Sequence, residues 1–193
     1  RSNATTNTNQ QIEGETILKD VIITGNSVAA DNQNGKGGGI YAYSSNPNLT
    51  NVMISNNSAA FGGGIYCYSS SNATLKNATI ENNFAIWHSG GGIYCYNSSP
   101  IFTDVMIINN SAIYGGGGGG MYVDGSYSSP ILTNVVFANN IARSGGGMQA
   151  NDSSPILTNV TMTNNTATNT EWYSRGGGIQ FNYNLNLENC IFW

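Results

Sequence analysis

A glycine-rich phrase repeats along the chain and constrains the fold more than any other feature. Three consecutive glycines followed by Ile or Met recur every 25 to 31 residues, beginning at Gly37, Gly62, Gly90, Gly118, Gly145 and Gly176. Self-similarity with a period of about 20–50 residues is the signature of solenoids and other repeat architectures. The repeat therefore predicts stacked copies of one structural unit.

Apolar residues recur at fixed places when seven units are aligned from Thr16 onward. A first column reads Leu18, Leu49, Leu75, Phe102, Leu132, Leu157 and Leu187. A second reads Val21, Val52, Ala78, Val105, Val135, Val160 and Cys190, and a third reads Ile23, Ile54, Ile80, Ile107, Phe137, Met162 and Phe192. Short alternating runs bounded by Gly, Asn and Ser predict strands.

Asn and Asp form two further columns. One lies between the Leu and Val columns and reads Asp20, Asn51, Asn77, Asp104, Asn134, Asn159 and Asn189. Because Asn and Asp tolerate left-handed backbone, this Asx column predicts a tight turn between two strands. The other reads Asn26, Asn57, Asn83, Asn110, Asn140 and Asn165. Stacked Asn side chains can form amide ladders, so we expect one along the axis.

These columns predict an all-β fold, a parallel β-helix of about seven coils. Each coil has ~27 residues and three short strands: one ending near Leu, one through Val and Ile, and one at Gly-Ile-Tyr-x-Tyr. A single coil cannot bury its own apolar face, so several must stack. We expect the β-helix to span residues 16–193 and residues 1–15 to form a polar tail or cap.

Composition narrows the choice of partners. Only 8% of the residues are charged, the net charge is −4, and the six basic residues are scattered. A nucleic-acid partner would need clustered Lys and Arg, so none is expected. No apolar run approaches the length of a transmembrane segment.

The three cysteines do not make a disulfide scaffold. Cys67 and Cys95 fall in one inward column on adjacent coils, with Ala42 before and Val123 after. We expect a free, stacked pair that behaves as two small apolar side chains. A bridge between them stays open, although stacked parallel strands aim both side chains the same way.

The repeat resembles a known family of bacterial surface proteins. The polymorphic outer-membrane protein repeat carries Gly-Gly-Ala-Ile-like and Phe-x-x-Asn tetrapeptides. Phe137 to Asn140 match the second literally, and Gly-Gly-Gly replaces Gly-Gly-Ala throughout. The resemblance covers about Thr16 to Trp193 and also includes the wider class of right-handed β-helix repeats. It implies that the solenoid is a right-handed parallel β-helix in a cell-surface setting, but it specifies no ligand.

The sequence shows no catalytic constellation, so we expect no enzyme activity, no cofactor and no metal site. Acidic residues do not cluster, and the best pair is Asp124 and Asp152, in neighbouring coils. The lone histidine, His88, has no evident catalytic partner. The triple glycines lack the Lys-Ser/Thr of a phosphate loop. We interpret the six-glycine run Gly115 to Gly120 as one glycine turn, lengthened.

Aromatic residues give the candidates for a contact surface. If Ile93 points inward, the alternate tyrosines of this strand point outward, in columns reading Tyr41, Tyr66, Tyr94, Tyr122 and Tyr43, Tyr68, Tyr96. Gln149, Asn151, Gln180 and Asn182 continue the face as a polar surface. Trp87 and Trp172 lie in extended loops before the glycine turns. Such a face could bind a glycan or a protein, or it could be ladder packing alone.

A second outward column supplies candidates for self-association. It is apolar where a solvated face would be polar, at Ile22, Met53, Met106, Val136 and Ile191. Phe192 and Trp193 join them because the last coil stops in mid-repeat, and an open strand edge is a template for another chain. The stripe predicts a face covered by a neighbouring chain or by the polar tail.

The features together predict a non-catalytic extracellular or cell-surface module with a structural or adhesive role. Self-association is the expected partner mode, as a fibre or filament subunit or as a fragment of a longer surface solenoid; glycans or surface proteins are further candidates. A polysaccharide-binding or polysaccharide-cleaving β-helix (lyase or hydrolase) is the first alternative. An ice-binding surface is the other, although Lys76 interrupts the column Thr50, Thr103, Thr133, Thr158.

Overall fold

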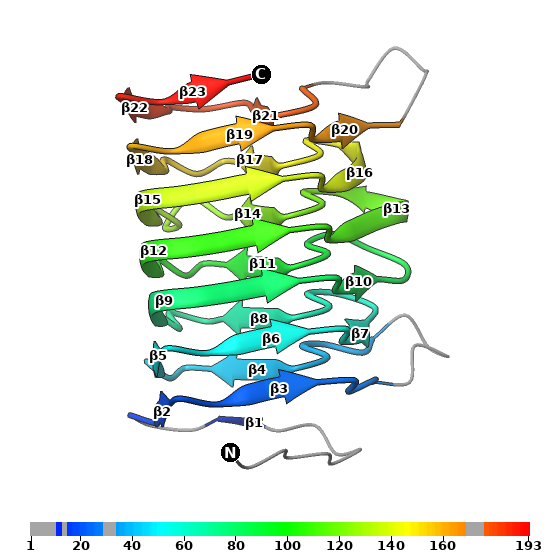
Figure 1. Ribbon diagram of the computed structural model, residues 1–193, viewed down its shortest axis with the longest axis vertical. Helices are drawn as coiled ribbons and strands as arrows, with labels where there is room; N and C mark the ends of the chain where they lie inside the picture. The colour runs from blue at the N-terminus through cyan, green and yellow to red at the C-terminus, as the bar shows by residue number, and fades with distance from the viewer. Residues whose placement is uncertain (1–10, 13–14, 29–33, 169–175) are drawn as a thin grey trace.

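The chain winds as a parallel β-solenoid. The computed structural model describes residues 11–12, 15–28, 34–168 and 176–193. Successive turns of chain stack along one axis, with the two described ends at opposite ends of the stack (Figure 1). All the strand pairings are parallel and join one coil to the next. No helix in this described part is long and apolar enough to cross a membrane.

Sheet A is the largest sheet and contains both segments that flank the Asx turn. Its 11 strands are β2 (Ile17–Lys19), β3 (Ile22–Thr24), β5 (Asn48–Thr50), β6 (Met53–Ser55), β9 (Thr74–Glu81), β12 (Ile101–Ile108), β15 (Ile131–Ala138), β18 (Ile156–Thr158), β19 (Thr161–Thr163), β22 (Asn186–Glu188) and β23 (Ile191–Phe192). In the middle coils the two segments fuse into one eight-residue strand with the Asx residue inside it.

Sheet B contains the Gly-Ile-Tyr-x-Tyr segments. Its 7 strands are β1 (Gln11–Ile12), β4 (Ile40–Tyr43), β8 (Ile65–Tyr68), β11 (Ile93–Tyr96), β14 (Met121–Asp124), β17 (Met148–Asn151) and β21 (Ile179–Phe181). Strand β1 pairs with β4 through Gln11 and Ile12, so two residues of the segment assigned to the tail take part in this sheet. Seven levels in sheets A and B correspond to about six full turns of chain.

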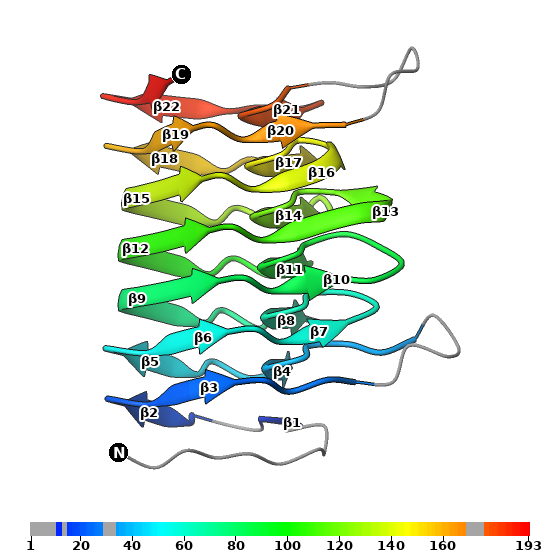
Figure 2. The ribbon, with the colours of Figure 1, turned by 45° about the vertical axis from the view of Figure 1, so that its right-hand side comes forward.

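Sheet C completes the three strands per coil, and its position was not predicted. It follows the Asn column and has 5 strands: β7 (Ser58–Ala59), β10 (Phe84–Ala85), β13 (Ser111–Gly117), β16 (Ile141–Ser144) and β20 (Thr166–Ala167). The inward side chains of this sheet are small: Ala85, Ala112 and Ala142 form an apolar cluster separate from the main core. The long strand β13 and the chain after β10 project from this corner of the solenoid (Figure 2).

Residues with a left-handed backbone conformation lie at the turns that the sequence predicted. All seven members of the Asx column have φ between 50° and 57°, which confirms the tight turn. A second left-handed column was missed: Asn56, Asn82, Asn109, Asn139 and Asn164, with Gly25 in the first coil. The sequence signal for this column was the Asn-Asn dipeptide of each coil, which is Gly-Asn in the first coil. Gly and Asn are the residues that adopt the left-handed conformation most readily.

The triple glycines form a turn that a side chain cannot enter. The first glycine of each has positive φ, and a Cβ on Gly62 would lie 2.4 Å from the carbonyl oxygen of Ile65. A Cβ on Gly63, the second, would lie 2.6 Å from the carbonyl oxygen of Gly91 in the next coil. The interpretation of the six-glycine run as one lengthened turn is wrong. Gly118 begins the turn, and Gly115 to Gly117 extend β13.

The core is a stack of apolar layers lined along one side by amides. The Leu, Val and Ile columns of the middle coils are fully buried, with Phe102 and Phe137 the largest side chains. In the Asn column, each side-chain oxygen accepts hydrogen bonds from the backbone and side-chain nitrogens of the preceding coil, at 2.9–3.1 Å. The expected amide ladder is therefore present.

Cys67 and Cys95 lie inside this core as a free pair. They are in register on β8 and β11, between Ala42 and Val123, and neither forms a disulfide. A side-chain hydrogen bond with Cys67, together with burial, raises the pKa of the Cys95 thiol. Both buried side chains pack as small apolar groups.

Candidate functional site

The outward tyrosines of sheet B stack into two ladders. Tyr66, Tyr94 and Tyr122 follow one another with ring centroids 4.9 and 5.0 Å apart. Tyr43, Tyr68 and Tyr96 form the parallel ladder at 5.6 and 5.5 Å, and Tyr41 joins the first from below. The register brings together the predicted tyrosine columns, because each coil repeats the same strand at the same height around the axis.

Two of these tyrosines are not available as a contact surface. Tyr66 and Tyr94 are only 5% and 8% exposed, which corrects the expectation of an open tyrosine face. Phe61, the residue just before a glycine turn, packs edge-on against both rings. The Lys36 ammonium lies 5.5 Å from the Tyr66 ring centroid. Burial raises the pKa of both phenols well above the usual value.

His88 has a partner that the sequence did not reveal. Its imidazole stacks on Phe61 with a centroid separation of 3.9 Å and an interplanar angle of 6°. Burial lowers the pKa of His88, so the ring is neutral at physiological pH. Trp87, its neighbour, is 46% exposed. Trp172, the other predicted loop aromatic, lies outside the described residues.

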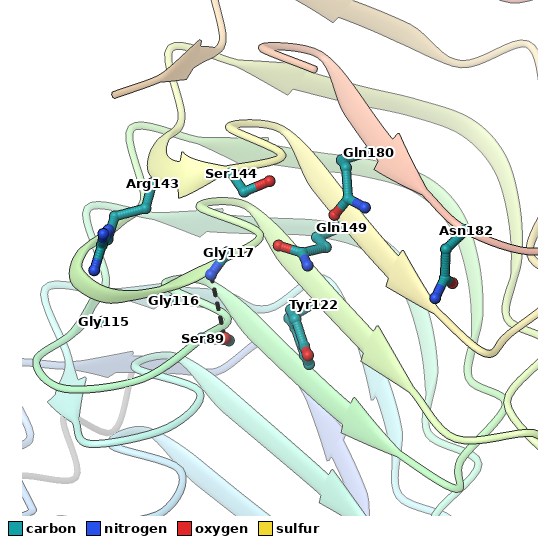
Figure 3. Close-up of a pocket in the computed structure, with 10 residues that line it drawn as sticks. All are labelled: Ser89, Gly115, Gly116, Gly117, Tyr122, Arg143, Ser144, Gln149, Gln180 and Asn182. Atoms are coloured by element: carbon teal, nitrogen blue, oxygen red, sulfur yellow. Dashed lines mark hydrogen bonds between the residues drawn. The ribbon is translucent and has the colours of Figure 1, made fainter. Parts of the chain in front are cut away.

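A cavity opens where the tyrosine ladder ends. It measures about 530 Å³ and lies between the end of β13, β16 and the outer face of sheet B (Figure 3). Its lining is mostly polar: Ser89, Gly115, Gly116, Gly117, Tyr122, Arg143, Ser144, Gln149, Gln180 and Asn182. The sequence had marked Gln149, Gln180 and Asn182 as a polar continuation of the tyrosine face, but not the glycines or Arg143.

The cavity exists because one position changes size along the axis. The residue before each glycine turn is Lys36 or Phe61 in the early coils, where it covers the tyrosines. In the later coils the same position is occupied by Ser89, Gly117 and Ser144. The backbone carbonyl of each accepts a hydrogen bond from the first glycine of the turn in the preceding coil, which shows that these positions stack on one another. Small residues there leave the outer face of sheet B uncovered above Tyr122.

The outer face of sheet A is the second candidate surface. The predicted stripe is exposed at Ile22, Met53, Met106 and Ile191, with Val136 half-buried. No described residue covers it, and the greater part of the polar tail lies outside the described residues. Phe192 and Trp193 are also exposed, on the last described level.

A second apolar column on sheet A was missed. Ile101, Ile131 and Ile156 lie in register on three successive coils and are 38–44% exposed. The signal was present, because these residues directly precede the Leu column and alternation turns them outward. The sheet thus presents two apolar columns on either side of a Thr and Asx strip.

The predicted acidic pair is not in register. Asp124 is in register with Asn151 rather than with Asp152, and Asp152 bonds Asn182 of the next coil. Burial, and more weakly the charge of Asp152, raise the pKa of Asp124. In the described part of the chain, no three His, Cys, Asp or Glu side chains gather in a way that could hold a metal ion.

The family follows from the first two thirds of the chain. A model of the right-handed β-helix region matches residues 1–128. The chain belongs to the right-handed β-helix family. No curated protein and no solved structure matched it. Family membership confirms the predicted fold and its hand, and this β-helix carries two surfaces of different character: the apolar outer face of sheet A and the polar cavity beside sheet B.

Proposed function

We propose that this β-helix is a non-catalytic extracellular or cell-surface module that serves a structural and adhesive role and self-associates through the outer face of sheet A. The observation that carries the proposal is the exposed apolar column Ile101–Ile131–Ile156. It runs beside a second column in which Met53, Met106 and Ile191 are exposed, Val136 is half-buried, and Thr79 and Thr161 are polar interruptions. A second copy of the chain fits this face best. Its columns repeat at the strand spacing, so an identical flat sheet can oppose them with matching periodicity.

Exposure of this kind is costly in an isolated molecule. Apolar surface contributes roughly 25 cal/mol per Å² when it is removed from water. Contiguous apolar patches on soluble proteins usually mark interaction sites. Between the columns, the Asx side chains bond along their own ladder, so these amides need few new hydrogen bonds from a partner sheet.

The cell-surface setting rests on sequence character. The repeat resembles that of polymorphic outer-membrane proteins in its Gly-Gly-x-Ile and Phe-x-x-Asn elements, and the chain is rich in uncharged polar residues, with 8% charged. A chain of this composition suits a secreted or surface-displayed solenoid that presents adhesive faces along its length.

Sedimentation velocity over a wide concentration range tests the association. The parent chain is expected to form dimers or larger species, and Met106→Thr combined with Ile131→Thr to sediment as a monomer. Threonine keeps a good strand residue while removing apolar surface. Tyr114→Thr is the matched control, because Tyr114 is exposed on β13, away from sheet A. A monomeric parent at all concentrations contradicts the proposal.

The non-catalytic role has its own test. We expect no cleavage of polygalacturonate or of other acidic glycans, with or without calcium, since Asp124 and Asp152 bond into different coils without a basic partner. Turnover that is lost on a single Asp substitution contradicts this part of the proposal.

A further inference from the structure

The cavity beside sheet B has features of a built binding site, on a different face from the apolar columns of sheet A. Its wall is glycine: a Cβ on Gly116 would lie 2.2 Å from Ser89 Oγ, and one on Gly117 would lie 1.4 Å from Gln149 Oε1. Any side chain at these positions would fill the space or displace Gln149. At about 530 Å³, the cavity lies within the usual range of ligand pockets, roughly 300–1,000 Å³.

The side-chain oxygens of two glutamines in this cavity lack hydrogen-bond donors. Gln149 and Gln180 occupy one column on β17 and β21, and the side-chain oxygen of each is buried without a partner. Leaving a buried acceptor unpaired costs about 1–3 kcal/mol, and native structures rarely do so without a reason. Two such acceptors in one cavity indicate that an incoming group supplies the donors.

The remaining groups define the chemistry of that ligand. Asn182 adds a third amide, and Arg143 adds one cation at the rim. Amides both donate and accept, which matches hydroxyl groups, since these also do both. A phosphate or sulfate would need several cations and would be repelled by the glutamine oxygens. Exposed Trp87 lies next to the glycine wall: its carbonyl oxygen is the atom nearest to a Cβ built on Gly115.

We propose that this cavity binds one or two sugar residues of a glycan, with ring hydroxyls bonded to the side chains of Gln149, Gln180 and Asn182. Arg143 bonds hydroxyl or carboxylate oxygens at the rim. The site goes beyond the proposed self-association and does not depend on it, because the two use different faces.

Binding must turn the two glutamine side chains. Their oxygens lie behind the cavity surface, so a sugar hydroxyl reaches them only after a rotation of the amide. Gln149 Nε2 meanwhile donates to Asn151 Oδ1, and Asn151 donates to the Tyr122 hydroxyl. The side-chain amide resonances of these residues therefore report occupancy directly.

The test uses the full chain on a printed array of neutral and uronic-acid oligosaccharides. We expect selective binding, with affinity reduced roughly tenfold by Gln180→Leu and by Arg143→Ala, the effect of one lost hydrogen bond with its partner left unpaired. Arg143 is exposed, so its variant keeps the fold even if the Gln180 variant does not. Asn48→Ala, an exposed amide on sheet A, is the matched control and should bind as the parent does.

Nuclear magnetic resonance with the best arrayed oligosaccharide locates the site. The side-chain amide signals of Gln149, Gln180 and Asn151 are expected to shift. Absence of binding to every arrayed glycan overturns the proposal, as does binding that survives both cavity variants or that shifts signals only on sheet A. Met106→Thr with Ile131→Thr should leave glycan binding intact, which separates a failure here from a failure of the association.

Discussion

At the scale of single residues, buried amides hold the coils in register. Each Asn of the buried ladder also donates its side-chain nitrogen to a backbone carbonyl beside the core, as Asn110 does to Ile80 at 2.9 Å. The ladder therefore also satisfies backbone N–H groups at the corner between sheets A and C, as the Asn110 oxygen does for the Asn83 N–H. An apolar residue of similar size would leave these groups buried and unpaired.

Asn110→Ala should lower the free energy of unfolding by about 2–4 kcal/mol. The substitution removes the acceptor of the Asn83 backbone and side-chain nitrogens and leaves both donors buried. Urea unfolding measures the loss. Asn48→Ala, which removes only an exposed bond from Thr50, is the control and should change stability by less than about 0.5 kcal/mol. Equal losses of unfolding free energy in the two variants would show that the buried ladder contributes no more to stability than an exposed hydrogen bond.

The exposed Asx ladder is interrupted at Asp104. Asn51, Asn77, Asn134 and Asn159 each donate to the Asx residue of the preceding coil, as Asn77 does to Asn51 and Asn134 does to Asp104. A carboxylate cannot donate, so Asp104 makes no bond to the Asn77 oxygen. The ladder is therefore divided into two shorter ones.

Asp104→Asn should close the gap and stabilise the protein by about 0.5–1.5 kcal/mol, the net value of one hydrogen bond. The new amide can donate to Asn77 and still accept from Asn134. Thermal unfolding at neutral pH is the measurement. Asp20→Asn is the control, since Asp20 only accepts a bond, from Asn51; an equal gain there would mean that removing charge, not closing the ladder, is responsible.

At the scale of elements, sheet B differs from sheet A in what covers it. Tyr66 and Tyr94 are buried under Phe61, whereas the apolar columns of sheet A are open. Burial also raises the pKa of Tyr122 to about 12. The raised pKa values of Tyr66, Tyr94 and Tyr122 therefore keep these phenols neutral in the folded state beyond the pH at which an unfolded chain loses those protons.

The sign of this shift predicts alkaline unfolding. A phenol in the unfolded chain has a pKa near 10, so above that pH the unfolded state binds fewer protons and gains stability relative to the folded state. The contribution of the ladder is complete below about pH 10 and is lost as pH rises toward the folded pKa values. Tyr94→Phe should move the alkaline unfolding midpoint, followed by circular dichroism and tyrosinate absorbance, to higher pH. An unchanged midpoint would contradict the assignment of the ladder as the sensitive element.

At the scale of the whole molecule, the solenoid is a stack of similar coils. Each coil contacts mainly its two neighbours, and such arrays derive stability from intrinsic coil terms and nearest-neighbour interfaces. One complete coil should therefore be removable, provided that the columns stay aligned.

Deletion of residues 101–130 should give a folded, less stable β-helix. It joins Pro100 to Ile131 and places Leu132 over Leu75 and Asn140 over Asn83, so that the core and the amide ladder both continue. A cooperative thermal transition at a lower temperature is expected. Deletion of residues 101–115 removes part of a coil, misaligns every column and should leave the chain unfolded; similar behaviour of the two deletions would contradict the columnar description.

The amino-acid sequence by itself determined the coil. Its period, its inward columns, the left-handed Asx turn and the glycine turn follow from local rules, because identical side chains must stack where backbones repeat at one spacing. The free Cys67–Cys95 pair was predictable for the same reason.

Only the tertiary structure decided which surfaces are covered. Phe61 reaches over Tyr66 and Tyr94 in this coil and the next, and the cavity combines Ser89, Gly116, Gln149 and Gln180 from four different coils. These contacts depend on side-chain size at the position before the glycine turns and on segments of variable length there. Such segments do not repeat, so the columns that predict the coil carry no information about how they pack.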